Sequence, residues 1–320
     1  MHHNCAAALL PGIRFSHTQD IDEHALALDG WHMHYDQVSS GRFEGQLGEL
    51  WLDGMQVVWD KSNQAMIKSG DAGRGTLTFS LPLRGAGAFH CAGHSIEEPR
   101  LLVACSDDLP VLRTPANLEL LCINVPAGEV AGALARQGIA DNLGALSQCY
   151  RLGPNGSHQA LARLAGGIFG QQPLAWLEHS TLRTAMRETL LLHLLDLLDT
   201  TRPDEVTPNA RMRLVRRARE CALAQPGTPP SILELCNRVG ASRRKLQYCF
   251  QQTLGINPVA YLRVLRLNAV HRALRRSEAG RVQDIALQWG FEHLSRFATD
   301  YRQLFGQLPS HTLKSARAAL

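Results

Sequence analysis

The sequence predicts an α+β protein: an N-terminal β-sandwich with packed helices, followed by a C-terminal part that is entirely helical. Three observations support this prediction. Apolar residues alternate with period two before Pro126, and Ala- and Leu-rich segments with helical periodicity follow it. Near the end of the chain, one helix–glycine–helix pattern occurs twice, in GASRRKLQYCFQQTLGINP (240–258) and GFEHLSRFATDYRQLFGQLP (290–309).

Composition limits the class of protein. The 320 residues suffice for two domains, and 45% hydrophobic and 19% charged residues are typical of soluble globular proteins. The N-terminal MHHNCAAALLPG lacks a basic start and a long apolar run, and LLLHLLDLL (190–198) is shorter than the roughly 20 apolar residues of a membrane helix. The eight cysteines include no C-x-x-C pair. We therefore expect a cytoplasmic protein with reduced thiols and no contact with a membrane.

Charge is divided unevenly along the chain. Residues 205–320 hold 19 Lys and Arg against 7 Asp and Glu, a net +12, whereas residues 1–204 hold 14 against 22, a net −8. A basic module joined to an acidic one is typical of a protein in which one half meets a polyanion. Nucleic acid is favoured over a membrane surface because the basic part has no continuous amphipathic helix ending in bulky apolar anchors.

The β-rich region extends to about residue 126. Six apolar residues of segment 43–59 fall on odd positions: Phe43, Leu47, Trp51, Met55, Val57 and Trp59. TLTFSLPLR (76–84) alternates in the same way, so each segment predicts one face of a sheet. Residues 101–106 and 118–125 predict further strands. The predicted interior is either a filled core or a pocket for an apolar or amphipathic effector, and small barrels are usually filled. The predicted pocket residues are Phe43, Trp51, Trp59 and Phe79, with Leu77 and Leu81 in the same lining.

Helices are predicted at 127–136, 158–169 and 178–199, the last with Ser180 as N-cap. Its apolar stripe is wider than one helix face, which leaves two alternatives: packing on its own β-domain, or the interface of a homodimer. The predicted dimerisation residues are Leu182, Met186, Leu190 and Leu194. The polar, proline-containing segment 200–210 is the predicted linker, which divides the chain into residues 1–199 and 211–320.

The repeated pattern predicts two helix-turn-helix units. In the first, Ile232, Leu235, Cys236 and Val239 have helical spacing, Gly240 permits a sharp turn, and Ser242 caps the next helix. The second has Val282, Ile285, Ala286 and Trp289, then Gly290, then Phe297, Tyr301 and Phe305. Between the units, Asn257 and Pro258 begin a helix to about residue 276, which spans about 28 Å and could separate two DNA-reading helices by nearly one turn of B-DNA.

Two joining segments carry a family resemblance: LGINPVAYLRVLRLNAVHRAL (254–274), and DIALQWGF (284–291) with the later FGQLP (305–309). With them, residues 231–313 resemble the AraC/XylS family of transcription regulators, and YLRVLRLNAVHRAL (261–274) is similar to the branch of the ethanolamine-operon regulator. The resemblance implies a bacterial-type regulator that binds double-stranded DNA and RNA polymerase, and an N-terminal cupin-like domain that senses an effector, forms a homodimer, or does both.

The resemblance also implies DNA-contacting residues. The family's base-reading face corresponds to Arg244, Gln247 and Tyr248, and in the second unit to Ser295, Arg296 and Thr299 beside Leu294. Arginine can pair with guanine and glutamine with adenine, although such residues can also bind phosphates alone. The predicted phosphate contacts are Arg243, Lys245, His293 and Arg302. Thr299, Thr312 and Leu313 depart from the family pattern, so the second unit could serve mainly as a backbone clamp.

Two other functions remain as alternatives. In one, the cupin-like domain binds a metal as a sensor or an enzyme, through HMH (His32, His34) or HCAGH (His90, Cys91, His94). The spacing lacks the cupin metal signature, and no G-x-S-x-G, phosphate-binding loop or dinucleotide motif occurs, so we expect no metal, no cofactor and no enzymatic activity. In the other, protein partners alone control the regulator.

Overall fold

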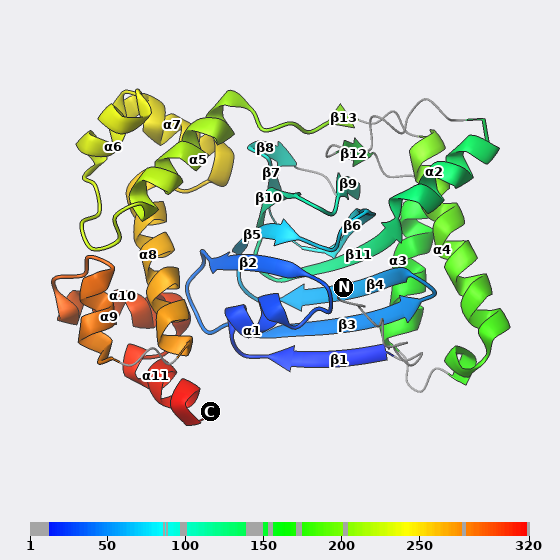
Figure 1. Cartoon of the computed structure of the whole chain (residues 1–320), viewed down its shortest axis with the longest axis horizontal. Helices are drawn as coiled ribbons and strands as arrows, with labels where there is room; N and C mark the ends of the chain where they lie inside the picture. The colour runs from blue at the N-terminus through cyan, green and yellow to red at the C-terminus, as the bar shows by residue number, and fades with distance from the viewer. Residues whose placement is uncertain are drawn as a thin grey trace, which may run out of the picture.

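The computed structural model describes residues 13–85, 87, 89–96, 101–138, 150–152, 156–170, 175–200, 204–276 and 280–318. Figure 1 shows a β-domain with helices α2, α3 and α4 on one side and a bundle of helices α5 to α11 on the other. The mixed architecture, with antiparallel sheets first and a helical domain after them, is the predicted fold class. No helix among the described residues is long and apolar enough to cross a membrane.

The β-domain has two antiparallel sheets. The larger has the strand order β1-β3-β4-β11-β6-β9-β12-β13 and the smaller β2-β5-β10-β7-β8. The strands of the larger sheet are β1 (Ile13–Thr18), β3 (Gly45–Leu52), β4 (Met55–Ser62), β6 (Thr76–Arg84), β9 (Leu101–Cys105), β11 (Leu118–Pro126), β12 (Tyr150–Leu152) and β13 (Asp204–Glu205). Those of the smaller sheet are β2 (His32–Gln37), β5 (Met66–Asp71), β7 (Phe89–Cys91), β8 (His94–Ile96) and β10 (Leu109–Thr114).

The predicted face of residues 43–59 is wrong because a hairpin turn reverses its parity. Asp53 and Gly54 form a two-residue turn with φ angles of 44° and 86°, as a type I′ hairpin requires. Leu52 therefore pairs with Met55, and each odd residue of β3 lies opposite an even residue of β4. Odd positions in the two strands thus face opposite sides of the sheet.

The predicted lining of the sandwich interior is wrong for Leu77, Phe79 and Leu81, whereas Phe43 packs with Tyr35, which lines the space between the sheets. Leu77, Phe79 and Leu81 pack with Val57 and with side chains of the covering helices, on the outer side of the larger sheet. The inner side carries several polar residues, because each strand alternates its faces. A cavity between the sheets is lined instead by residues that include Trp31, Tyr35, Lys68, Thr78 and Cys122.

The helices that cover the larger sheet agree with their predicted ranges. They are α2 (Ala127–Arg136), α3 (Gly156–Gly170) and α4 (Ser180–Thr200), with the short 3-10 helix η2 (Ala175–Glu178) before α4. Leu190, Leu194 and Leu197 of α4 are at most 1% exposed and belong to the core beneath these helices. The apolar stripe of α4 thus packs largely against its own β-domain.

The C-terminal bundle follows the predicted pattern. Its helices are α5 (Ala210–Leu223), α6 (Ile232–Val239), α7 (Arg243–Leu254), α8 (Pro258–Arg275), α9 (Val282–Gln288), α10 (Leu294–Phe305) and α11 (Pro309–Ala318). The Asn257 side chain accepts a hydrogen bond from the amide of Ala260 at the start of α8, with Pro258 in its first turn. Gly240 and Gly290 follow α6 and α9 with φ of 66° and 74°, and a Cβ at Gly290 would lie 2.5 Å from Cδ of Pro229.

Helix α8 is shared by two separate cores. Tyr261 and Leu265 pack with α5, α6 and α7, whereas Val270 and Leu274 pack with α9, α10 and α11. Figure 1 accordingly shows α5 to α7 around one end of α8 and α9 to α11 around the other. One rigid helix therefore sets the separation of the two units.

Candidate nucleic-acid interface

The first unit exposes the polar face of α7. Ser242 caps this helix by accepting a hydrogen bond from the amide of Lys245, at 3.2 Å. Leu246 and Phe250 are fully buried on the inner face, whereas Arg244 and Gln247 are exposed. This alternation follows from helical periodicity, because the two faces of an amphipathic helix meet different surroundings.

The exposed face of α7 is cationic and has an aromatic residue at its centre. Arg243 and Lys245 lie beside Arg244, and none of the three has an ion-pair partner in the part of the chain that the structure describes. Tyr248 is 54% exposed. A surface with unpaired arginine forks, an amide and a phenol can offer hydrogen bonds to base edges and phosphates.

The second unit exposes a smaller polar face on α10. Ser295, Arg296, Thr299 and Arg302 are exposed, opposite the buried Phe297 and Tyr301. The Thr299 hydroxyl donates to the backbone carbonyl of Ser295, at 3.0 Å. That hydroxyl is thus bonded within its own helix, and Arg296 is the longest donor in the predicted base-reading set of this unit.

A basic groove lies beside the start of α10. Its cavity of about 200 Å³ is lined by side chains of α8, of the α9–α10 turn and of α10: Arg263, Arg266, Gly290, Phe291, Glu292, His293, Arg296 and Phe297. His293 occupies the N-cap position of α10 without a side-chain capping bond. Amide groups in the first turn of such a helix attract anions.

The arginines of this groove repel one another. Burial and the nearby charge of Arg296 lower the pKa of Arg263, and burial and Arg263 lower the pKa of Arg266. Asp300 pairs with Arg263, yet Nε of Arg263 is buried and finds no acceptor among the described residues. Arg266 lies over the ring of Phe291, 5.1 Å from its centroid. An anion here would relieve an excess of positive charge, as a DNA phosphate would.

The sequence prediction missed Arg263 and Arg266. It treated α8, the helix that carries them, as a spacer. It placed the DNA contacts only on the second helix of each helix-turn-helix unit. Their spacing of three residues, which puts both on one face of α8, is the signal that could have found them. The structure adds that this face borders the start of α10.

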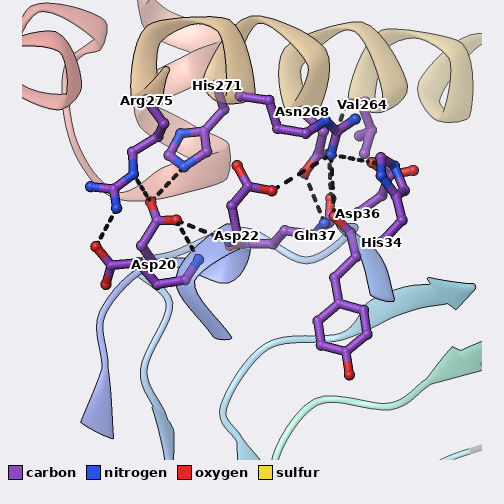
Figure 2. Close-up of polar contacts among 12 residues, drawn as sticks. Asp20, Asp22, His34, Asp36, Gln37, Val264, Asn268, His271 and Arg275 are labelled. Carbon is purple, nitrogen blue, oxygen red and sulfur yellow. Dashed lines mark hydrogen bonds and ion pairs between the residues drawn. The ribbon is translucent and has the colours of Figure 1, made fainter. Parts of the chain in front are cut away.

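A buried polar contact joins the two halves of the molecule (Figure 2). His271 of α8 lies with Nε2 2.7 Å from a carboxylate oxygen of Asp20, as Figure 2 shows. Its Nδ1 lies 2.6 Å from the Tyr301 hydroxyl. Asp20 is also the N-cap of α1 (Ile21–Leu26) and accepts from the amides of Asp22 and Glu23. Burial raises the pKa of Asp20, but the hydrogen bond and charge of His271 and the charge of Arg275 outweigh it, so this pKa lies below its usual value.

A second part of the same contact is made by Asn268 and Arg272, which lie before and after His271 on α8. Asn268 accepts a hydrogen bond from the Gln37 amide at 2.9 Å and donates to the Gln37 carbonyl at 3.0 Å. Arg272 donates to the carboxylate of Asp36 at 3.0 Å. We call the contact of Asp20, Asp36 and Gln37 with α8 the interdomain clasp. It brings acidic side chains of the first half against basic ones of the second.

Among the described residues, Asp20, Asp22 and His271 form the one group of three or more ligand-type side chains whose ligand atoms all lie within 4.8 Å of one another. Arginines already supply positive charge there: Arg275 Nε lies 3.5 Å from Asp20, and a guanidinium nitrogen of Arg272 lies 3.9 Å from Asp22. These contacts explain the cluster of Asp20, Asp22 and His271 as a set of buried ion pairs within the clasp.

The histidines considered as metal ligands do not gather in one place. His32 is exposed and lies 3.0 Å from Asp71, and His34 lies 3.3 Å from Asp36. His90 is buried in β7. His94 Nε2 lies 2.9 Å from the carbonyl of Thr207.

The predicted pocket and dimer residues lie in several environments. Phe43 is buried beside His24, Phe79 is in the core under the helices, and Trp59 stacks on Phe169 of α3. Trp51 Nε1 donates to Glu49. In α4, Leu190 and Leu194 are buried, Met186 is half-buried, and Leu182 is 47% exposed.

Comparison with known proteins finds a helix-turn-helix domain near the end of the chain. Residues 235–315 match the family model described as a helix-turn-helix domain. The chain is 36% identical over 104 residues to the "Probable thc operon regulatory protein" of Rhodococcus erythropolis, covering 32% of this chain and 31% of that protein. It is 30% identical over 178 residues to the "HTH-type transcriptional activator RhaR" of Klebsiella pneumoniae, covering 53% and 59%.

Among solved structures, the crystal structure of a probable AraC family transcriptional regulator from Rhodopseudomonas palustris matches with 35% identity. The match covers 32% of this chain and 97% of that one, with a TM-score of 0.31. The matched segment spans about a third of the length of the first of the two curated relatives. Residues 235–315 thus form a helix-turn-helix domain similar to those of known transcription regulators.

Proposed function

We propose that the chain is a transcription regulator of the AraC family that reads DNA with two helix-turn-helix units. The observation that carries this proposal is the exposed face of α7, with Arg244, Gln247 and Tyr248, on a domain that matches the helix-turn-helix family. In the proposed complex this face enters a major groove, where Arg244 pairs with guanine and Gln247 with adenine.

The second unit enters the next major groove along the same side of the duplex. The 18 residues of α8 span about 27 Å, which is close to the 34 Å of one DNA turn. Arg296 is its main base-reading side chain, with Ser295 and Thr299 beside it. The basic groove next to α10 binds a phosphate, and Arg302 and His293 extend that backbone contact.

The interdomain clasp supplies the route of control. Because α8 carries both units, a change in the N-terminal domain that shifts Asp20 or Asp36 would shift the helix that spaces them. The N-terminal domain would respond to an effector, with protein partners as the alternative input. A homodimer would bring Leu182 and neighbouring exposed side chains of α4 together, and the DNA-bound form would contact RNA polymerase in the cytoplasm.

Two finer assignments belong to the same proposal. Residues 261–274 are similar to the branch of the ethanolamine-operon regulator, and the genes that the protein controls would test that placement. Metal-dependent or enzymatic activity of the N-terminal domain is the less favoured function, since the described histidines are dispersed. Metal content of the purified protein distinguishes the two, because stoichiometric zinc or iron would favour the alternative.

Selection of binding sites from random duplexes by the full chain tests the proposed function. We expect one enriched sequence with two conserved segments about one helical turn, roughly 10 base pairs, apart. Arg74→Ala is the matched control for loss of an arginine, because Arg74 is exposed on the β5–β6 turn, far along the chain from both units. Binding without any sequence enrichment, or to a single short segment, would contradict the proposal.

A further inference from the structure

A cavity of about 320 Å³ lies where the segment before α5 crosses the β-domain. One wall consists of the ends of β9 and β10 and the β7–β8 turn, and the other consists of residues 206–208 and the first turns of α5. In Figure 1 this segment and α5 pass beside β7, β8 and β10. The cavity therefore has walls from both halves of the molecule, and its volume is at the lower end for small-molecule sites.

The inner lining of this cavity is apolar. Ala92, Ala104, Val206 and Met212 are each at most 7% exposed, and half-buried side chains of β10 such as Leu109 continue the surface. Binding of a ligand here would be favourable because it removes apolar groups from water. The body of the ligand should therefore be a short aliphatic or aromatic group.

The rim of the cavity is predominantly cationic. Arg213 and Arg216 project from α5, and Asp108 is the acidic side chain in the lining. Arg213 donates one hydrogen bond to the carbonyl of Pro208 at 2.7 Å, and Arg216 lies 3.8 Å from Glu220 in a pair whose side chains are both more than 60% exposed. Such an exposed pair is weak, so both guanidinium groups keep donors for a carboxylate.

The two walls are joined tightly beside the cavity. The Asn209 side chain donates to the Gly93 carbonyl at 2.9 Å, and His94 Nε2 lies 2.9 Å from the Thr207 carbonyl. Gly93 has φ +86°, and a Cβ on it would lie 2.9 Å from Cβ of Met212. The β7–β8 turn thus contacts the first turn of α5 directly, so a ligand in the cavity packs next to a fixed point about which α5 could turn.

Helix α5 also supports the first DNA-reading helix. Leu214, Val215 and Ala218 of α5 share a core with Leu246 and Phe250 of α7. A displacement of α5 is therefore transmitted to the face that carries Arg244.

We propose that this cavity binds a small amphipathic carboxylate, with the apolar body between β10 and α5 and the carboxylate on Arg213 and Arg216. Occupancy fixes α5 against the β-domain and changes the affinity of the first unit for DNA. The regulatory part of this inference rests on the proposed function, whereas the binding part does not.

Calorimetric titration of the full chain with octanoate tests the binding, with octan-1-ol and octylamine as probes of equal chain length. We expect saturable binding of octanoate with a Kd below about 1 mM, weaker binding of the alcohol and none of the amine. Replacing both arginines (R213Q/R216Q) should raise the Kd for octanoate about tenfold or more, and Asp108→Asn should lower it. All three positions are exposed, so these variants should fold.

Equal affinity for octanoate and octan-1-ol, no saturable binding, or an unchanged Kd in R213Q/R216Q would overturn the site. DNA affinity of the ligand-free and octanoate-saturated chain is measured on the same preparations. An unchanged DNA affinity at saturation would overturn the regulatory role. Octanoate binding without DNA binding would refute the proposed function but not the ligand site. Specific DNA binding without octanoate binding would refute the ligand site but not the proposed function.

Discussion

Within the interdomain clasp, the contact between Asp20 and His271 should contribute measurably to the free energy that holds the two halves of the molecule together. Asp20→Asn removes the negative charge that faces His271 but keeps an N-cap for α1, because asparagine caps helices as well as aspartate does. A hydrogen bond to a charged group contributes about 1.5 to 3 kcal/mol. We therefore expect Asp20→Asn to weaken the contact by about 2 kcal/mol, since the Asp20 side chain is only 8% exposed.

Weakening of the contact lets the interface open more often, and hydrogen exchange of two backbone amides measures that opening locally. The Gln37 amide donates to Asn268 and the Gly41 amide to the carbonyl of Leu304, so both bonds cross the interface. A loss of about 2 kcal/mol should speed their exchange about thirtyfold. Glu23→Gln is the matched control, because the Glu23 side chain is 47% exposed in its pair with Arg275 and should change exchange by about twofold at most.

Unchanged exchange at Gln37 and Gly41 in Asp20→Asn would show that the Asp20–His271 contact does not stabilise the interface. An equal acceleration at the amide of Val58, in the middle of β4, would also contradict the prediction, because that result would indicate global destabilisation rather than opening of the interface.

Three further predictions concern the glycines of the two turns, the pKa of Asp20 and the basic groove. Gly240→Ala should cost about 1 to 2 kcal/mol in denaturant unfolding and Gly290→Ala more, because only at Gly290 would the new Cβ overlap a neighbouring ring; equal costs would contradict this. Because the pKa of Asp20 is lowered, this carboxylate stabilises the contact above its ordinary pKa of 3.8 and loses that effect as the pH falls. The protection factor of the Gln37 amide, which is its intrinsic exchange rate divided by the observed rate at each pH, should therefore fall below about pH 4 in wild type and fall less in Asp20→Asn, where Asp36 is the carboxylate that still titrates in the contact. Arg266→Gln should weaken binding to all DNA sequences alike and reduce the slope of log K against log salt by about 0.9, whereas an unchanged slope would remove Arg266 from the phosphate contact.

Much of the helical half could be predicted from the sequence because its signals are local. Asn257 and Pro258 specify the start of α8, and Gly240 allows the left-handed residue that ends α6. The apolar spacing of Leu246 and Phe250 then fixes which face of α7 is buried.

The β-domain was harder because its faces depend on how strands pair. After the two-residue turn at Asp53 and Gly54, the even positions of β4 face the side of the sheet that the odd positions of β3 face. A period-two pattern counted through this turn therefore assigns the residues of β4 to the wrong face. Because the strand pairing could not be known from the sequence, Phe79 was likewise predicted in the interior of the sandwich. The structure instead buries it beneath the covering helices.

The interdomain clasp and the basic groove could not be predicted, because both are built from residues distant in sequence. Asp20 and His271 are separated by 251 positions, and each alone is an ordinary polar residue in an amphipathic segment. Arg263 and Arg266 gain their significance only when α8 lies against the start of α10.

The dissociation constants of wild type and Arg244→Ala, on the selected sequence and on random DNA, test the central claim most directly. If α7 reads bases, Arg244→Ala should lose about 1 to 3 kcal/mol on the selected sequence, tolerate a changed base at one position, and lose much less on random DNA. Arg74→Ala should match wild type on both. An equal loss on both DNAs, or no loss on either, would contradict base reading by Arg244.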